Sequence, residues 1–215
     1  MVLEIGDSLG NDLGWGLNRE IGGNPGLTLI QKDKSDTGLS NSWYYSWSDH
    51  LATYLHEYHP HLVVIFLGGN DEQGMMYHGH AAAFGTPQWH AAYLQQAKSL
   101  ASLAHRAGSY LLWVGMPVMQ PPQYRQGMVV LNSLFEEAAT SVPGGTFLPT
   151  WSVLAGSGGT FLHAGYVNHS YQVLRSPDGI HLQVAGENVM ATYVARSLSA
   201  IYHVPLRLSA PEQLD

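Results

Sequence analysis

A serine, a histidine and an aspartate lie in short segments whose composition suits nucleophilic catalysis. Ser8 lies in the segment 6–10 (GDSLG), and His181 ends the segment 178–181 (DGIH). A serine hydroxyl is a weak nucleophile unless a neighbouring base removes its proton. The short turn between Asp178 and His181 lets the carboxylate reach Nδ1 of the imidazole, which leaves Nε2 free as that base. The residue types therefore permit a Ser-His-Asp site.

Each segment also has a purely structural explanation. An Asp or Ser ahead of a helix commonly caps its N-terminus, which would account for Asp7 or Ser8 without chemistry. Asp178 could likewise cap a turn that merely places His181 against an apolar surface. Taken singly, both explanations stay open for each segment.

An amide and a glycine could complete an acyl-transfer site. Asn70 lies in the segment 68–71 (GGND), directly after an apolar run, where its side-chain NH₂ could donate to an oxyanion. The same composition is common in turns. Gly38, in the segment 36–40 (DTGLS), could expose its backbone N–H to the same point.

The elements that must position these groups are strands and helices in alternation. The run 62–67 (LVVIFL) is apolar without alternation, which predicts a strand buried on both faces. Further strands are expected at 2–5, 27–30, 110–115 and 146–148, and helices after Ser8 and at 47–58, 89–107, 128–139 and 185–202. We expect one α/β domain over residues 1–215, a three-layer α/β/α sandwich with a flavodoxin-like, mainly parallel five-stranded sheet.

The carboxyl ends of parallel strands form the edge where ligands bind in such sheets. The loops after Ile5, Ile30, Leu67 and Val114 are therefore expected to share one rim, and these loops carry Ser8, Gly38 and Asn70. We expect the segment 155–175, which is rich in glycine and aromatic residues, to be an irregular loop over this face.

Composition excludes several other classes of protein. With 45% hydrophobic and 12% charged residues, the 215-residue chain is not a disordered one. The formal charge of −7 disfavours nucleic acid and anionic membranes as partners. No cysteine is present, so disulfides and thiolate nucleophiles are excluded. Histidine pairs such as His78 with His80 lack further ligands at suitable spacing, so we expect no metal and no cofactor.

The candidate segments, in this order, resemble the SGNH, or GDSL-type, hydrolase superfamily of esterases and lipases. Segments 6–9 and 68–71 are similar to its first and third blocks, Gly38 to the glycine of its second, and 178–181 to its Asp-x-x-His block. This similarity extends over nearly the whole chain. The segment 6–10 also fits the Gly-x-Ser-x-Gly pattern of α/β-hydrolases, but there the serine normally follows several strands rather than the first.

The resemblance implies the role of each residue. Ser8 would be the nucleophile, His181 the general base and Asp178 the group that orients it. The oxyanion hole would consist of the Ser8 N–H, the Gly38 N–H and the Asn70 amide. Residues 68–178 are also similar to a bacterial cell-envelope branch without a settled substrate. That similarity implies an extracytoplasmic location, reached with a leader or anchor that the printed sequence does not include; no window of the sequence has the pattern of a signal peptide or a membrane span.

Large side chains after the second and third segments are expected beside the rim. They could stack on a sugar ring or line an acyl pocket, or they could simply pack in the core. These candidate substrate contacts are Trp43, Tyr44, Met75, Tyr77 and Met116.

The expected function is that of a serine ester hydrolase acting on small acyl esters or O-acylated carbohydrate. An O-acyltransferase that passes the acyl group to a glycan hydroxyl would use the same acyl-enzyme, and the sequence does not distinguish it from a hydrolase. A non-catalytic carbohydrate-binding module is a second alternative, against which the joint presence of Ser8 and His181 argues. A flavodoxin-like phosphate binder is a third, but Asp7 would repel a phosphate and a glycine-rich nest is absent. The oligomeric state stays open.

Overall fold

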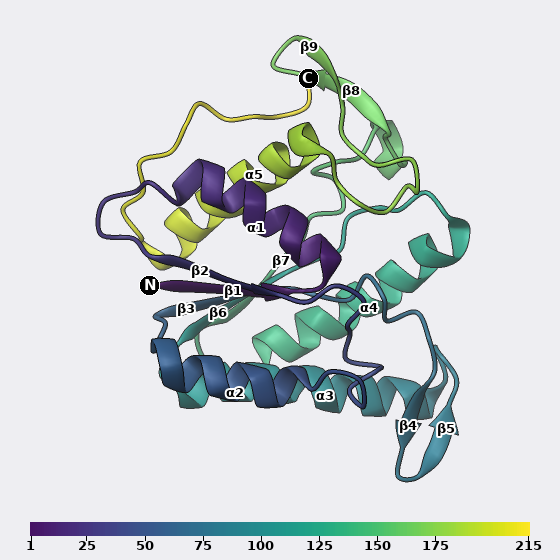
Figure 1. The fold of residues 1–215 in the computed structure, drawn as a ribbon. Coiled ribbons are helices and arrows are strands. Elements are labelled where there is room, and N and C mark those ends of the chain that lie inside the picture. The colour runs from purple at the N-terminus through teal and green to yellow at the C-terminus, as the bar shows by residue number, and fades with distance from the viewer.

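The sheet of the protein is parallel throughout and has five strands. The computed structural model describes residues 1–215 and orders the strands β2-β1-β3-β6-β7 (Figure 1). This is the order of flavodoxin-like folds, as the sequence predicts. The strands are β1 (Val2–Gly6), β2 (Leu29–Asp33), β3 (Leu62–Phe66), β6 (Tyr110–Val114) and β7 (Gly145–Leu148).

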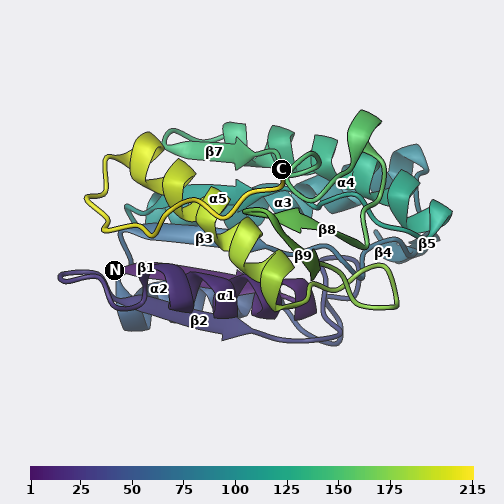
Figure 2. The same cartoon turned by 90° about the horizontal axis from the view of Figure 1, so that it is seen from above.

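Helices cover both faces of the sheet, which confirms the predicted three-layer sandwich. Helices α1 and α5 pack together on one face, and α2, α3 and α4 cover the other (Figure 1); Figure 2 looks onto the α1–α5 layer. None of the helices is long and apolar enough to cross a membrane. Their bounds are α1 (Ser8–Ile21), α2 (Trp47–Tyr58), α3 (Pro87–Arg106), α4 (Pro122–Thr140) and α5 (Val184–Tyr202).

The central strands form where the sequence has continuous apolar runs. Every residue of β1 and of β3 is buried, because helices cover both sides of these strands. The strand predicted at 27–30 is instead β2, at 29–33. It lies at the edge of the sheet and is half-buried, so polar residues such as Lys32 belong to it and the apolar run alone misplaced its bounds. Helix α4 begins at Pro122, six residues before the predicted start, because its first turns are largely exposed and carry little apolar pattern.

The expectation of an irregular loop over 155–175 is wrong for its second half. Strands β8 (Ala164–Val167) and β9 (Ser170–Val173) form an antiparallel hairpin there, after a short 3₁₀ turn at Ser157–Gly159. The two turn residues, Asn168 and His169, both have positive φ, as a type I′ turn requires. Asn168 is a usual first residue of such a turn, but His169 replaces the usual glycine, so the sequence gives a poor hairpin signal.

A second hairpin follows the third segment. It consists of β4 (Met75–Tyr77) and β5 (His80–Ala82), and its turn residues His78 and Gly79 also have positive φ. Both hairpins project beyond the carboxyl ends of the sheet strands, one from each face of the sandwich (Figure 1). They therefore flank the edge at which the candidate residues gather.

Candidate active site

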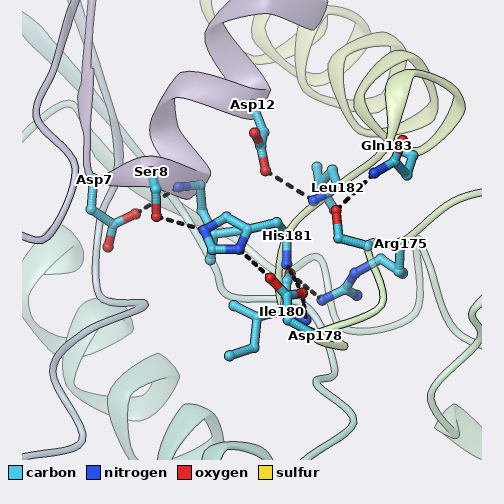
Figure 3. Close-up of polar contacts among 11 residues, drawn as sticks. Asp7, Ser8, Asp12, Arg175, Asp178, Ile180, His181, Leu182 and Gln183 are labelled. Carbon is cyan, nitrogen blue, oxygen red and sulfur yellow. Dashed lines mark hydrogen bonds and ion pairs between the residues drawn. The ribbon is translucent and has the colours of Figure 1, made fainter.

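Ser8 is the first residue of α1 and follows β1 after only Asp7. The chain turns sharply here, and Gly6 permits the turn: a Cβ at this position would lie 2.2 Å from the carbonyl oxygen of Phe66 and 2.6 Å from Cα of Gly10. Ser8 is half-buried, and its side chain points toward His181 (Figure 3). Local backbone packing thus presents the Ser8 hydroxyl at the rim.

Ser8, His181 and Asp178 form a continuous hydrogen-bonded chain. His181 Nε2 lies 2.8 Å from Ser8 Oγ, and His181 Nδ1 lies 2.7 Å from Asp178 Oδ2 (Figure 3). A carboxylate can only accept hydrogen bonds, so Nδ1 carries the proton and Nε2 faces the hydroxyl with its lone pair. The side chains of His181 and Asp178 are 37% and 44% exposed, which leaves the site open to solvent.

The turn around Asp178 keeps that carboxylate ionised. Partial burial acts to raise the pKa of Asp178, but the bond from His181 and the N–H groups of Ile180 and His181 outweigh it and hold the pKa below its ordinary value. Asp178 Oδ1 accepts those N–H groups at 2.8 and 3.0 Å. One carboxylate therefore shapes the turn with one oxygen and orients the imidazole with the other.

Three possible oxyanion donors lie on adjacent loops. The Asn70 amide donates one hydrogen to Thr37 O at 3.0 Å, which fixes its orientation and leaves its second hydrogen unused. The backbone N–H groups of Ser8 and Gly38 have no acceptor within the protein. A Cβ on Gly38 would lie 2.1 Å from Asp71 Oδ1, so only glycine fits at this position.

Asp7 joins the first segment to the third. Its buried carboxylate accepts the N–H of Leu9 at 2.9 Å and caps α1, as the structural explanation for this residue expects. The other oxygen accepts the N–H groups of Gly68 and Gly69 at 3.0 and 2.7 Å. Burial raises the pKa of Asp7 to about 6, although these N–H groups act to lower it.

Asp71 joins the third segment to the second. It is fully buried and accepts the N–H of Leu39, the N–H and hydroxyl of Ser40, and the hydroxyl of Tyr93. Burial raises the pKa of Asp71, and the bonds from Ser40 and Tyr93 oppose the rise. The loops of Gly38 and Asn70 are thus held together from beneath.

The predicted substrate contacts lie in different surroundings. Trp43 is 84% exposed and, with Met75, lines a hollow of about 340 Å³ between the Ser40 loop and the β4–β5 hairpin. Tyr44 is exposed and Tyr77 half-buried, and neither lines this hollow. Met116 is fully buried and has no surface to offer, because its side chain packs in the hydrophobic core. We therefore remove Met116 from the candidate contacts.

The largest hollow, of about 640 Å³, lies between the 155–162 loop, the β8–β9 hairpin and the C-terminal residues. Neither Ser8 nor His181 lines it. No group of three or more His, Asp or Glu side chains is arranged to hold a metal ion.

Sequence reasoning missed side chains that hold the segments in place. Asp12 Oδ2 accepts the N–H of Leu182 at 2.9 Å and so ties α1 to the residue after His181. Its position four residues after Ser8, on the same side of the helix, is a signal that could have revealed it. Asp71 adjoins Asn70, but its four donors come from distant positions. Arg175 donates to the carbonyl oxygens of Val118 and Ile180, and nothing in the sequence marks it.

Comparison with known proteins identifies the family and the fold. Residues 1–197 match a family described as "Protein of unknown function (DUF459)". No curated protein matches the chain. Among solved structures, the chain is similar to a GDSL-like lipase from Bacteroides thetaiotaomicron VPI-5482, with a TM-score of 0.62 and 16% identity over 93% of this chain and 87% of that chain.

Two esterases have similar folds. The psychrotrophic esterase EstA from Pseudoalteromonas sp. gives a TM-score of 0.60 and 15% identity over 94% of this chain and 98% of that one. A catalytic mutant of Axe2, an acetylxylan esterase from Geobacillus stearothermophilus, gives a TM-score of 0.60 and 15% identity over 92% of this chain and 93% of that one. At these identities the likeness concerns the fold alone. The chain therefore belongs to the DUF459 family and has the fold of the SGNH, or GDSL-type, hydrolases.

Proposed function

We propose that the protein is a serine ester hydrolase that acts on small acyl esters or O-acetylated carbohydrate. The observation that carries this proposal is the hydrogen-bonded chain from Ser8 through His181 to Asp178. Its members come from opposite ends of the sequence, and no requirement of folding alone brings a hydroxyl, an imidazole and a carboxylate into this order. The same arrangement recurs on unrelated hydrolase folds.

In the first half of the reaction, the neutral His181 imidazole takes the proton of Ser8 as Oγ attacks the ester carbonyl carbon. Asp178 stabilises the imidazolium that forms. The carbonyl oxygen becomes an oxyanion and accepts hydrogen bonds from the N–H groups of Ser8 and Gly38 and from the second hydrogen of the Asn70 amide. Collapse of this intermediate breaks the ester C–O bond, and His181 gives its proton to the leaving alcohol.

In the second half, water replaces the alcohol. His181 removes a proton from the water as its oxygen attacks the acyl carbon on Ser8 Oγ. Collapse of the second intermediate releases the carboxylic acid and returns the proton to Ser8. The half-exposed imidazole gives water a direct approach to the acyl-enzyme.

The surroundings of the site favour an alcohol that carries a sugar ring. Ser8, Asn70 and His181 do not line the hollow beside Ser40, but the exposed Trp43 indole at its edge offers a flat face of the kind that stacks on a sugar ring. An acetylxylan esterase is among the proteins of similar fold. Acetylated glycans are therefore the first substrates to test.

A chain-length series of 4-nitrophenyl esters tests the proposal, followed by acetate release from acetylated glycans. The wild type should hydrolyse short esters, and Ser8→Ala should lose at least about 10³-fold in kcat because the nucleophile is gone. Ser42→Ala, which changes an exposed serine near the same rim, is the matched control and should retain full activity. Undiminished hydrolysis by Ser8→Ala would exclude the mechanism.

A further inference from the structure

Arg175 is a fully buried cation that has no carboxylate partner. Its side chain is 0% exposed, and none of the ion pairs in the structure includes it. Burial lowers the pKa of Arg175 to about 10, while the charges of Asp178 and Asp12 act to raise it, so the guanidinium stays charged at neutral pH. A buried charge without a paired carboxylate is costly, so its contacts need an explanation.

The guanidinium connects two loops through their backbone carbonyls. Nη1 donates to Val118 O at 2.9 Å, in the loop after β6, and Nη2 donates to Ile180 O at 2.6 Å. Ile180 lies between Asp178 and His181, so the second bond holds the turn that joins acid and base (Figure 3). The ring of Phe161 lies 5.2 Å from the guanidinium carbon and covers it.

Few other contacts fix this turn against the rest of the protein. The N–H of Gln120 donates to Gly179 O at 3.0 Å, and the N–H of Ser176 donates to His181 O at 2.9 Å. The N–H of Leu182, the residue after His181, donates to Asp12 Oδ2 at 2.9 Å. The side chains of Asp178 and His181 are themselves partly exposed. Arg175 is therefore the one buried side chain that donates to a backbone carbonyl within the turn itself. Its forked donors reach two carbonyls in a way that the single ammonium of lysine does not reproduce.

We propose that Arg175 is a positioning residue, which holds the Ile180 carbonyl and thereby aims the Asp178–His181 pair at Ser8. It touches neither the substrate nor the reacting atoms. Its bond to Ile180 determines where the imidazole lies, and an error of about 1 Å in such a position can reduce a rate about 10²-fold. The predicted effect on activity rests on the proposed ester hydrolysis, whereas the effect on the imidazole does not.

The test compares Arg175→Met and Arg175→Lys with Arg125→Met. Arg125 is the matched control because it donates to Met119 O and Gln120 O in the same loop but does not touch the catalytic turn. On a short 4-nitrophenyl ester, Arg175→Met should lower kcat about 10²-fold with little change in KM, because binding is untouched and only the alignment is lost. Arg175→Lys should lower kcat at least tenfold, and Arg125→Met should stay within threefold of the wild type.

A second readout does not depend on activity. In the wild type, the proton of His181 Nδ1 should give a far-downfield ¹H NMR resonance, because its short hydrogen bond to Asp178 deshields it. Arg175→Met should broaden or lose this resonance, and Arg125→Met should keep it. If no ester is hydrolysed by the wild type but the resonance behaves as stated, the proposed function fails and the role of Arg175 stands.

Several results would overturn the role of Arg175. These are a folded Arg175→Met protein with the resonance intact, a kcat within threefold of the wild type where the wild type is active, or a wild type without the resonance. Circular dichroism and urea unfolding establish whether each variant is folded. If Arg175→Met does not fold, Arg175→Lys is judged by the same criteria, and failure of both to fold would assign Arg175 to stability rather than to positioning.

Discussion

Two aspartates at the site each make two kinds of contact, one with each carboxylate oxygen. Asp7 caps α1 and also holds the N–H groups of Gly68 and Gly69, and Asp178 shapes its own turn and also binds His181. A structural explanation is therefore sufficient for Asp7 but incomplete for Asp178. At the scale of single residues, one carboxylate can shape a turn and orient the proposed base because it has two oxygens.

Asn70 is the residue whose proposed role is easiest to separate from structure. Asn70→Ala removes the proposed oxyanion donor and should lower kcat by about 10²–10³-fold, with a much smaller effect on KM. Steady-state kinetics on a short ester measure this split. Asn41→Ala, which also removes an amide bonded to a loop carbonyl but lies outside the proposed oxyanion site, is the control and should be unaffected. A kcat within threefold of the wild type for Asn70→Ala would remove Asn70 from the mechanism.

At the scale of elements, the rim is assembled by loops that a single buried carboxylate holds together. Asp71 accepts four donors from the Leu39–Ser40 loop and from α3. Gly38 must be glycine because Asp71 occupies the space of a Cβ. The position of the Gly38 N–H, a proposed oxyanion donor, therefore depends on how the loop of Asp71 packs against it.

Asp71→Asn tests this arrangement. The asparagine would turn an NH₂ toward groups that themselves donate, so at least one buried donor would lose its acceptor, at a cost of about 1–3 kcal/mol in the free energy of unfolding. Urea denaturation measures this value. The exposed Asp49 gives the control substitution Asp49→Asn, which should change the free energy by less than about 0.5 kcal/mol. An equally small change for Asp71→Asn would contradict the account of the rim.

The elements themselves were predictable where the apolar pattern was strong. The runs that became β1, β3 and β6 were located within a residue or two, because burial on both faces requires continuous apolar sequence. The hairpins β4–β5 and β8–β9 were not predicted, since they are short, largely exposed and joined by turns in which histidine takes one of the two usual places. Edge strand β2 was displaced because it is half-buried and includes polar residues that the apolar pattern does not mark.

The order of the candidate segments predicted which residues would meet, but not what supports them. Ser8 and His181 were identified because each lies in a compact, recognisable segment. The contacts of Arg175 and Asp12 join positions far apart in the sequence, and no local pattern records a contact that only the folded chain creates. Met116 was misjudged because a strand end can lie at the rim while its side chain points into the core.

At the scale of the whole molecule, buried acids accumulate beneath and beside α1. Glu4 on β1 is fully buried, and its carboxyl contacts that of Asp33 on β2; neither Glu4 oxygen has a donor in the protein. Burial, followed by the charge of Asp33, raises the pKa of Glu4 well above its ordinary value, and burial raises that of Asp33 to about 7. We infer that the pair shares a proton. Burial also raises the pKa values of Asp7 and Asp12 to about 6.

These shifts determine the sign of the pH dependence of stability. An acid whose pKa is higher in the folded chain binds its proton more tightly there, so its stabilising contribution is complete at low pH and is lost as the pH rises through the folded value. Asp178 has a lowered pKa, so its contribution to stability is lost as the pH falls, but this loss occurs only in more acidic solution. The Tm should therefore fall from about pH 5 to about pH 8, by at least about 2–4 °C.

Glu4→Gln should reduce this fall and raise the Tm at pH 8, because the amide can donate to the Asp33 carboxylate and brings no buried charge of its own. Differential scanning calorimetry at both pH values measures the effect, with the exposed Glu57 changed to Gln as the control. A Tm that rises from pH 5 to pH 8 in the wild type, or a Glu4→Gln protein with an unaltered pH dependence, would contradict the shared proton.

The central claim is that Ser8 is a nucleophile activated by His181, and covalent labelling tests it most directly. An alkyl phosphonate ester with a 4-nitrophenyl leaving group should modify the wild type once, with tandem mass spectrometry placing the label on Ser8 Oγ. Ser8→Ala should remain unlabelled, and His181→Ala should react at least about 10³-fold more slowly, since the base is lost. Labelling of another residue, or equal labelling rates for the wild type and His181→Ala, would contradict the account.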